Sequence, residues 1–451
     1  MSKWEKNFVR INEQEVIEEE EDFGNFPKVE MKQHLVQLIK PWLAAIFQSE
    51  HLSLLLGSGF TTAIASKAGT SVASMQATYD NFPRADLLEK KVREYTIVAG
   101  RGEPNVEDRI RVANLLLEGL KILEHEDCSE LDAAINELMS DFLKSISETE
   151  INLRDKFYEK KAVESAIAEE ISEEKREEEA GEYVEKLTAT DLLVSFLLSF
   201  ANRTASRERL NIFTTNYERL IEHGCDLAGI RVVDRFVGCL EPVFRSSRVN
   251  VDMHYNPPGI RGEPRYLEGV VRLTKLHGSL DWKYTNGVVR RVGLPFGAPI
   301  DHPEFNSEVS DSVMIYPNSA KDRETSEYPY VELFRDYAAT VCQPNSALVV
   351  YGYGFGDEHI NRVIEDMLTI PSTHVVIISY DNAGGRIERF CQKVGRKQQI
   401  TLLIGKHFSD IENLVENYLP QPSVDVLKFR EAEIARRMFV PQKIEGTGSA
   451  A

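Results

Sequence analysis

The run Leu54-Leu55-Leu56-Gly57-Ser58-Gly59-Phe60 changes abruptly from large apolar residues to glycine and serine. This change predicts a buried strand over residues 53–56, a tight turn, and a helix over residues 60–67. Backbone N–H groups at such a helix start favour an anion such as a pyrophosphate. The turn lacks the last glycine of the G-x-G-x-x-G fingerprint, because Thr62 occupies that position, and it is not a P-loop. Taken alone, the turn is equally consistent with a plain strand-to-helix connection.

Three later segments end in a similar way, with a β-rich run that stops at glycine or at a small polar residue. They are IFTTNY at 212–217, LHGS at 276–279 and VVYGYGFGD at 349–357. Ligands collect at the carboxyl ends of strands in an open parallel sheet, so four such endings can converge on one crevice. Together they supply a glycine turn, an Asn and a His, which are the parts needed to hold a dinucleotide and attack it.

Asn216 and His277 are the candidate reactive side chains, and each has a structural alternative. Asn216 follows an expected strand, where it can cap the next helix or can hold a ribose hydroxyl or a water. His277 stands at a turn, where it can be structural or can accept a proton, because the ordinary pKa of imidazole is about 6.5. The residues themselves leave these alternatives open.

The composition indicates a globular protein without general affinity for nucleic acid or anionic membranes. The chain has 451 residues, of which 42% are hydrophobic and 28% charged, and its formal net charge is -19. Nucleic acids and anionic lipids favour Lys and Arg, so this charge argues against both as partners. Residues 1–40 lack a signal-peptide pattern, and no apolar stretch suggests a membrane span. We therefore expect a cytoplasmic protein.

The five cysteines are scattered and predict free thiols. No two of them form a C-x-x-C pair, which argues against a structural zinc site with four Cys ligands. Free thiols fit a reducing cytosol. The cysteines are Cys128, Cys225, Cys239, Cys342 and Cys391.

From residue 210 onward, short β runs alternate with helical segments, which predicts the α/β class with a Rossmann-like parallel sheet. The expected strands lie at residues 211–215, 269–276, 347–352, 374–379 and 400–404, and the expected helices at residues 217–228, 361–368, 383–394 and 410–419. Residues 238–268 and 296–322 are loop-rich, and such segments often carry function or cover a site.

A long helical region separates the first expected strand from the others. Asn105 is a plausible helix cap, and helical spacing continues with breaks to about residue 200. Residues 148–186 are rich in Glu and Lys, which favours a solvated helical face, with a subunit contact as the alternative. The acidic residues within 12–22 are expected to be solvated and flexible, ahead of a helix over residues 31–48.

These patterns divide the chain into four expected units. Residues 1–48 form an acidic segment and a helix, and residues 103–200 form a helical insertion. Residues 49–102 and 201–420 together form a nucleotide-binding domain, and residues 421–451 form a C-terminal helix and tail.

The order of the motifs resembles the sirtuin family. Sirtuins carry a glycine-alanine-glycine turn, a Thr-Gln-Asn segment and a catalytic His followed by Gly, in the order of residues 57–60, 214–217 and 277–278 here. The closer match is to the sirtuin-like proteins of bacterial anti-phage defence systems. These carry GSGF, TNY, LHGS and GFxD stretches, the last of which corresponds to residues 354–357. The resemblance spans residues 50–405 and is confined to the motifs.

Two departures from the sirtuin pattern bear on the activity. The Pro-Asp-Phe-Arg segment that follows the first glycine turn in sirtuins is not found, and neither is the four-Cys zinc ribbon of the protein deacylases. Without the ribbon there is no evident cleft for an acetyl-lysine peptide. The resemblance therefore implies hydrolysis of NAD, on a sirtuin-like sheet with a large helical insertion and no zinc ribbon.

The resemblance also implies roles for individual residues. Asn216 would fix the nicotinamide ribose and a water, and His277 would act as the general base. NAD is the implied substrate, and no metal is needed because NAD already carries a cationic leaving group. Asp357 and Asn361 can equally cap the helix that begins there, and Asp281 and Trp282 are candidates by proximity only. The implied NAD-binding residues are Gly57, Ser58, Gly59, Phe60, Thr215, Gly354, Phe355, Asp357 and Ser379.

As a whole, the resemblance implies an NAD+ hydrolase that forms nicotinamide and ADP-ribose and depletes NAD during phage infection. Two alternatives stay open, a regulatory module that binds NAD or ADP-ribose without hydrolysis and an NAD-dependent protein deacylase. Such a hydrolase must be gated. Defence relatives with this short layout work with a HerA-type hexameric ATPase and form large ring-like homo-oligomers, and here the helical insertion is the expected place of subunit contacts.

Overall fold

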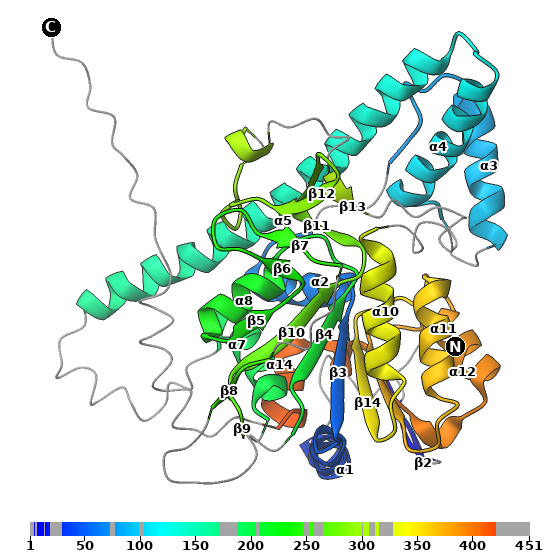
Figure 1. Ribbon diagram of the computed structural model, residues 1–451. Helices are drawn as coiled ribbons and strands as arrows, with labels where there is room; N and C mark the ends of the chain where they lie inside the picture. Colours follow the sequence, from blue (N-terminus) through cyan, green and yellow to red (C-terminus); the bar gives the residue numbers. More distant parts are fainter. Residues whose placement is uncertain are drawn as a thin grey trace, which may run out of the picture.

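The computed structural model has a central sheet of nine strands within the described residues (Figure 1). The structure describes residues 4, 7–12, 14–18, 29–72, 77–98, 103–170, 187–203, 207–246, 252–255, 265–299, 301–305, 312–314 and 328–420. From edge to edge the strands are β2 (Gln14–Glu18), β1 (Asn7–Ile11), β16 (Ile400–Ile404), β15 (His374–Ser379), β14 (Ser346–Tyr351), β3 (His51–Leu56), β4 (Leu210–Thr214), β10 (Val270–Lys275) and β5 (Arg231–Val233). The strands from β16 to β5 run parallel, which confirms the predicted α/β class.

The strand order reverses direction beside β3, at the centre of the sheet. The chain places β4, β10 and β5 on one side of β3 and then returns to place β14, β15 and β16 on the other. In this doubly wound arrangement, the crevice outside the carboxyl ends at the reversal point is the usual place for a ligand. The register sets Leu56 beside both Tyr351 and Thr214, so β3, β4 and β14 end at one level.

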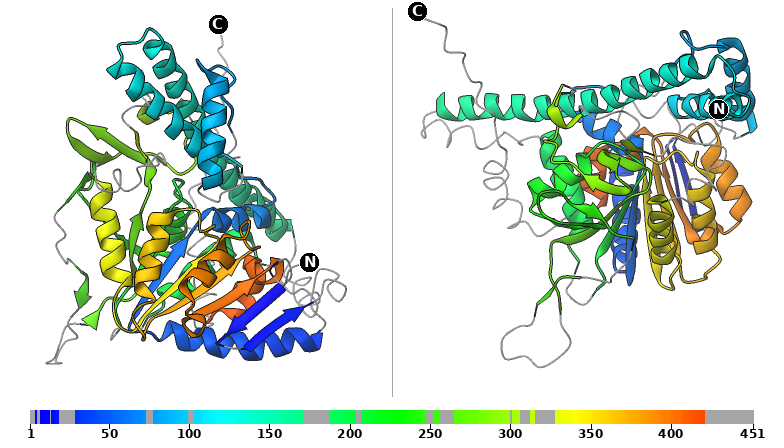
Figure 2. Two further views of the ribbon diagram at one scale, coloured as in Figure 1. Left: turned by 90° about the vertical axis from the view of Figure 1, so that its right-hand side faces the viewer. Right: turned by 45° about the horizontal axis from the view of Figure 1, so that its top comes forward.

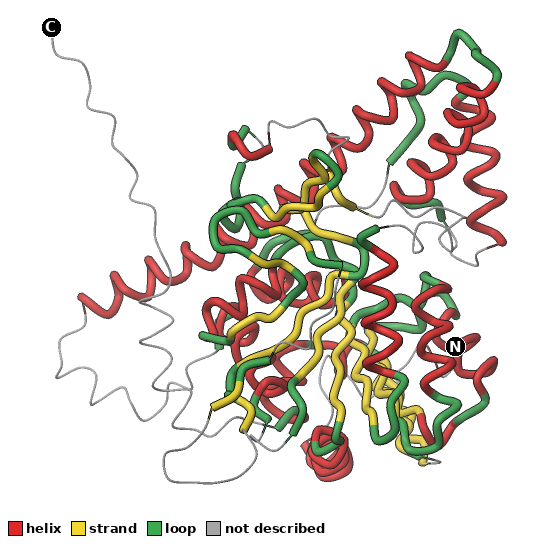
Figure 3. Tube along the Cα trace, in the orientation of Figure 1, coloured by secondary structure: helices red, strands yellow, loops and turns green. Residues whose placement is uncertain are grey.

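Helices cover both faces of the sheet (Figure 3). Consecutive residues of β3 alternate between the two cores, since Leu54 packs into one and Leu55 into the other. One face is covered by α1 (Val29–Phe47), α2 (Ser58–Ala68), α7 (Ala189–Ala201), α8 (Leu220–Ala228), α13 (Lys406–Ser409), α14 (Ile411–Asn413) and the π-helix Leu414–Tyr418. The other face is covered by α10 (Tyr330–Val341), α11 (Glu358–Met367) and α12 (Arg386–Val394). Each large apolar side chain buried in this way contributes about 1.5–3 kcal/mol.

The N-terminal segment joins the sheet, and β2 ends at Glu18, the first residue of the acidic run that is expected to be solvated and flexible. β1 pairs antiparallel with β16, and β2 pairs antiparallel with β1. The physical reason is burial: Phe8 and Val9 of β1 are almost fully excluded from solvent. Residues 19–28 lie outside the described residues.

The helical insertion forms an arm that crosses above the carboxyl ends of the sheet (Figure 2). The arm consists of α4 (Val106–Ile122) and α5 (Cys128–Glu170) of the insertion together with α3 (Ala85–Val98), which precedes it, and the three helices share a core of their own. Helix α7, at the end of the expected insertion, packs on the central sheet instead. Asn105 caps α4 as predicted, because its side chain accepts a hydrogen bond of 2.8 Å from the backbone N–H of Asp108. Helix α5 extends well past the sheet in Figure 1.

A second, smaller sheet is built from strands that lie before and after β10 in the sequence. Its strands, in order, are β13 (Ser312–Met314), β11 (Gly278–Thr285), β12 (Val288–Arg291), β7 (Val243–Phe244) and β6 (Phe236–Val237), and a separate pair is formed by β8 (His254–Tyr255) and β9 (Arg265–Tyr266). A short 3-10 helix spans Pro303–Phe305. The predicted loop-rich segments 238–268 and 296–322 therefore contribute strands to small sheets.

Several expected boundaries shift, while the strands at 374–379 and 400–404 agree residue for residue. Helix α8 begins at Leu220 rather than residue 217, and α2 begins at Ser58 rather than residue 60. All five cysteines are free thiols. Among the described helices, none is long and apolar enough to cross a membrane. The expected helix within 421–451 lies outside the described residues, and the division into four units stays a prediction.

Candidate functional site

A cleft of about 710 Å³ lies between the carboxyl ends of β3, β4 and β14 and the helical insertion. This volume falls within the range of ~300–1,000 Å³ that is usual for small-molecule sites. Loops at the strand ends, helix α2 and the segment just after α2 supply most of its wall, and α4, α5 and Arg386 of α12 supply the rest. The described lining includes Gly57, Ser58, Thr61, Glu107, Ser145, Ile146, Thr149, Thr215, Asn216, Tyr217, Glu218, His277, Tyr353, Gly354, Gly356, Asp357 and Arg386.

The glycine turn after β3 packs directly against the turn after β14. The backbone N–H of Gly59 donates to the carbonyl oxygen of Gly352 at 2.9 Å, and that of Gly57 donates to Tyr351 at 3.1 Å. A Cβ added to Gly57, Gly59 or Gly352 would lie 2.5–2.7 Å from backbone atoms of the facing turn. Glycine at these positions therefore lets two strand ends meet, and it leaves the start of α2 at the edge of the cleft.

Asn216 is held on the cleft wall by three hydrogen bonds from its side-chain amide. Its Nδ2 donates to the carbonyl oxygen of Gly57 at 3.1 Å, to the hydroxyl of Thr61 at 3.1 Å and to the carboxylate of Glu218 at 2.9 Å. Helix α8 begins four residues later, so Asn216 does not cap it. The structure thus places this amide in the cleft rather than at a helix start.

The partners of Asn216 fix the orientation of its amide. All three partner atoms can accept hydrogen bonds, and a carboxylate and a backbone carbonyl accept only, so the NH2 group must face them. The carbonyl Oδ1 of Asn216 makes no hydrogen bond with any described residue. The side chain therefore offers a fixed acceptor in a site that is 6% exposed.

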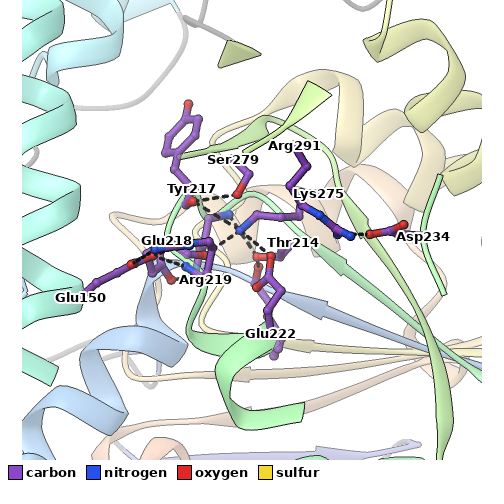
Figure 4. A network of polar contacts seen from close by, with 12 residues as sticks. Glu150, Thr214, Tyr217, Glu218, Arg219, Glu222, Asp234, Lys275, Ser279 and Arg291 are labelled. Atoms are coloured by element: carbon purple, nitrogen blue, oxygen red, sulfur yellow. Dashed lines mark hydrogen bonds and ion pairs between the residues drawn. The ribbon is translucent and has the colours of Figure 1, made fainter. Parts of the chain in front are cut away.

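The loop of residues 215–219 is anchored to helix α5 by a buried ion pair (Figure 4). Arg219 donates to Glu150 from its guanidinium at 2.6 Å and from its backbone N–H at 2.7 Å. Glu150 is fully buried; burial opposes the charge of Arg219, but Glu150 outweighs it and raises the pKa of the guanidinium. The Tyr217 hydroxyl donates to Glu107 of α4 at 2.8 Å, and burial together with Glu107 raises its pKa well above the ordinary value. The insertion therefore holds the loop that carries Asn216.

His277 stands at the bend between β10 and β11, and its side chain lines the same cleft. Gly278 follows with φ of 87°, a left-handed conformation that glycine adopts without strain. The His277 ring is 2% exposed, and its Nε2 lies 3.4 Å from Nε2 of His359, which belongs to α11. His359 is thus a candidate for holding the orientation of His277.

The loop after β14 is braced from within, and Arg386 of α12 contacts it. The hydroxyl of Tyr353 donates to Asn361, and the amide of Asn361 donates to the carbonyl oxygen of Phe355, both at 3.1 Å. Asn361 therefore shapes the loop rather than lining the cleft. Asp357 stands at the start of α11 without a capping hydrogen bond from its side chain, and it does line the cleft. Arg386 donates from Nε to the carbonyl oxygen of Gly354 at 2.5 Å.

Four of the expected NAD-binding residues are not part of the cleft wall. Phe60 is fully buried and packs against Phe196 with ring centroids 5.1 Å apart. Phe355 stacks on Phe390 at 4.8 Å beneath the loop, and Ser379 is buried at the end of β15. The N–H of Gly59 is already used by the turn after β14. Asp281 and Trp282 line a second cavity instead.

Several residues that line the cleft escaped the sequence analysis. Glu218 stands only two positions after Asn216, and Thr61 stands one turn into α2 from the glycine turn. Both residues stand close enough to the motifs in the sequence that they could have been proposed as cleft residues once the strand ends were expected to surround a cleft. Glu107 and Arg386 carried no such signal, because their approach depends on how α4 and α12 pack.

Residues 210–402 match the family model of the SIR2-like domain, which supports a sirtuin-like family. SIR2-like domains use NAD, so the match fits an NAD-related activity. The matched region includes Asn216, His277 and the loop after β14, and it begins after the helical insertion. A search among curated proteins finds no match to this sequence.

Proposed function

We propose that this protein is an NAD+ glycohydrolase, which converts NAD and water to nicotinamide and ADP-ribose. The observation that carries the proposal is that Asn216 and His277, which lie 61 positions apart in the sequence, line one cleft at the reversal point of a SIR2-like sheet. An amide and an imidazole facing one cleft suit an attack on the nicotinamide–ribose bond. In this proposal NAD is the substrate, and the residues that bind it are those that line the cleft.

The reaction breaks the bond between the anomeric carbon of the ribose and the nicotinamide nitrogen. The electron pair of that bond leaves with the nicotinamide, and the sugar passes through an oxocarbenium-like state. Water then adds to the anomeric carbon and loses one proton. Since the leaving group is already cationic, the protein mainly needs to position the reactants and to stabilise positive charge on the sugar.

Asn216 and Glu218 suit the first of these tasks. The carbonyl of Asn216 can accept from a ribose hydroxyl or from the attacking water, in an orientation that its three hydrogen bonds fix. The carboxylate of Glu218 lines the same wall, where a negative charge stabilises the oxocarbenium-like state. His277 would accept the proton that the water loses.

Positive charge is supplied by Arg386 of α12, which contacts the loop after β14. Arg386 and the start of α2 at Ser58 line the cleft and suit the pyrophosphate of NAD. Gly354 lets the backbone of this loop approach a ligand. Gly57, Ser58, Thr215, Gly354 and Asp357 are thus proposed to contact NAD.

The decisive experiment is incubation with NAD of the protein purified alone and together with its proposed activating partner, followed by separation of nicotinamide and ADP-ribose. We expect both products from the activated wild type and none above background from His277→Ala under the same conditions. His34→Ala is the matched control, because this histidine is exposed on α1. Equal turnover by His277→Ala would remove this residue from the mechanism, and NAD binding without products would favour a regulatory module. Acetyl-ADP-ribose formed with an acetylated peptide would favour a deacylase.

We further propose that the enzyme depletes NAD as an anti-phage defence effector in the cytoplasm. An ungated NAD hydrolase would harm its own cell, so we propose activation through a HerA-type hexameric ATPase and assembly into a ring-like homo-oligomer. The insertion supports this idea, because α5 projects beyond the sheet and also holds the loop of Asn216. Light scattering gives the oligomer size, and NAD loss in phage-infected cells with and without the ATPase tests the gating. NAD loss that is independent of the ATPase would contradict the partner.

A further inference from the structure

His359 is a buried histidine that the proposed reaction does not use. It is 7% exposed and stands in the first turn of α11. Its Nε2 lies 3.4 Å from Nε2 of His277, and the centroids of the two rings are 5.6 Å apart. His277 lines the cleft, whereas His359 is not among the described residues of the cleft wall. Any effect of His359 on a ligand in the cleft would therefore pass through His277.

Separate elements of the fold bring the two rings together. His277 follows β10 and His359 follows the loop after β14, and these two strands lie on opposite sides of β3. The ring of Phe334 on α10 packs edge-on against the His359 ring, with centroids 4.7 Å apart. The contact between the two histidines is thus set by the packing of the core.

Two Nε2 atoms that face each other can share only one proton in a hydrogen bond. One ring must carry hydrogen on Nε2, and the other must present a bare Nε2 as the acceptor. Two protonated Nε2 atoms would oppose two donors, and two bare ones would oppose two acceptors. The distance of 3.4 Å is long for a hydrogen bond, but catalytic hydrogen bonds are often this long outside the complex with substrate. The pair therefore has two consistent arrangements, which differ in the ring that donates.

Proton transfer in the cleft is compatible with only one of them. In the proposed reaction His277 accepts the proton that the water loses, so its ring ends with hydrogen on both nitrogens. Its Nε2 must then donate, and a bare Nε2 of His359 can accept. In the reverse arrangement, Nε2 of His277 would use its lone pair on His359. The other nitrogen of His277, Nδ1, would already carry a proton and could not accept one.

We infer that His359 is a positioning residue, which accepts a hydrogen bond from Nε2 of His277 and so leaves Nδ1 of His277 as the proton acceptor. His359 carries its own proton on Nδ1. As the oxygen of the water bonds to the anomeric carbon, one proton moves from the water to Nδ1 of His277. This step rests on the proposed hydrolysis of NAD, whereas the arrangement of protons in the pair is measured without NAD.

Solid-state 15N spectra of the full chain, labelled in its histidine rings, test the arrangement of protons directly. They are recorded without NAD at pH 8, above the ordinary imidazole pKa of about 6.5. The signals of His277 and His359 are those that are lost in His277→Ala and in His359→Phe. We expect His277 to carry its proton on Nε2 and His359 to carry its proton on Nδ1. Any other arrangement overturns the inference.

NAD turnover, under the conditions that activate the wild type, tests the role of the contact. His359→Phe keeps a flat ring but offers no acceptor, and we expect kcat to fall on the order of 10²-fold with little change in KM. His359→Gln offers its amide oxygen as an acceptor and should restore kcat to within about tenfold of the wild type.

The outcomes separate this inference from the proposed function. A wild-type kcat in His359→Phe overturns the inference and leaves NAD hydrolysis standing. Equal losses in His359→Phe and His359→Gln would assign His359 to packing alone and also overturn it. A wild type that forms no nicotinamide contradicts the hydrolysis, and the 15N spectra then decide the arrangement of protons by themselves.

His374→Gln is the matched control for a histidine that is held through Nε2. Nε2 of His374 lies 2.8 Å from the hydroxyl of Thr401, and the residue begins β15 at the amino end of the strand, whereas the cleft lies at the carboxyl ends. This variant should keep the wild-type kcat and the wild-type 15N signals of His277 and His359. Thermal unfolding of the two His359 variants shows whether either is unfolded, and the arrangement of protons is in any case read in the wild type.

Discussion

The two cavities on either side of the loop 215–219 differ in how their polar groups are satisfied. In the cleft, Asn216 uses its amide N–H groups fully within the protein and keeps only an acceptor for a ligand. In the second cavity, Arg219 of the same loop is paired with Glu150 and interacts electrostatically with Asp281. A side chain fixed by its own protein is suited to chemistry, because it needs no reorganisation during the reaction. Charges that engage one another are suited instead to holding the loop in place.

The largest effect is expected from Asn216→Ala, which removes the fixed acceptor from the cleft. We expect NAD turnover to fall on the order of 10³-fold, because the ribose or the water loses its position. The measurement is product formation with saturating NAD.

Asn136→Ala is the matched control, since this asparagine is exposed on α5. Its turnover should equal that of the wild type. If Asn216→Ala kept the wild-type turnover, the fixed acceptor would take no part in the reaction, and the contrast between the two cavities would fail.

The sequence could predict the cleft because a parallel sheet brings its strand ends to one edge. Four motifs that end in small or polar residues therefore met, as expected, around Gly57, Asn216, His277 and Gly354. Side chains next to the motif residues were harder to place, because successive side chains at a strand end point in different directions, some into the core and some into the cleft. Phe60 and Phe355 follow glycines at the strand ends and yet pack into the cores.

The second cavity could not be predicted in the same way. Its lining extends from Asn211 to Thr340 and joins both sheets, so it depends on non-local packing. One signal was present: Asn286-Gly287 between two β runs indicates a two-residue hairpin, and both residues have positive φ, at 55° and 78°. That turn joins β11 to β12, which would have placed Asp281 on a strand.

The second-largest effect is expected from Glu150→Gln, which breaks the buried ion pair that supports the loop of residues 215–219. In Glu150→Gln, Arg219 loses its charged partner, and we expect a loss of about 3 kcal/mol in the free energy of unfolding. Because Arg219 stands on the loop, NAD turnover should also decline. Thermal unfolding and the NAD assay check this prediction.

Glu148→Gln is the control for Glu150→Gln, because Glu148 is exposed on the same helix. The control should leave both measurements unchanged. A variant Glu150→Gln that loses stability but keeps its NAD turnover would show that the loop does not need α5 for its position.

A smaller effect, confined to the cleft, is expected from Glu218→Gln. The amide cannot supply the negative charge beside the sugar, so kcat should fall on the order of 10²-fold, with little change in KM. Glu118→Gln, at an exposed position of α4, is the control. A rise in KM with kcat unchanged would instead assign Glu218 to substrate binding.

The smallest effect is expected from Arg386→Ala, at the edge of the cleft near Gly354. If Arg386 pairs with the pyrophosphate, its loss removes one charge-assisted hydrogen bond and raises KM for NAD roughly tenfold, with kcat nearly unchanged. Arg389→Ala alters an exposed arginine on the same helix and should keep the wild-type KM. The effect of Arg386→Ala should weaken as salt is added, because the interaction is between charges near the surface. A fall in kcat instead of a rise in KM would mean that the bond to the Gly354 carbonyl, which shapes the loop, matters more than the charge.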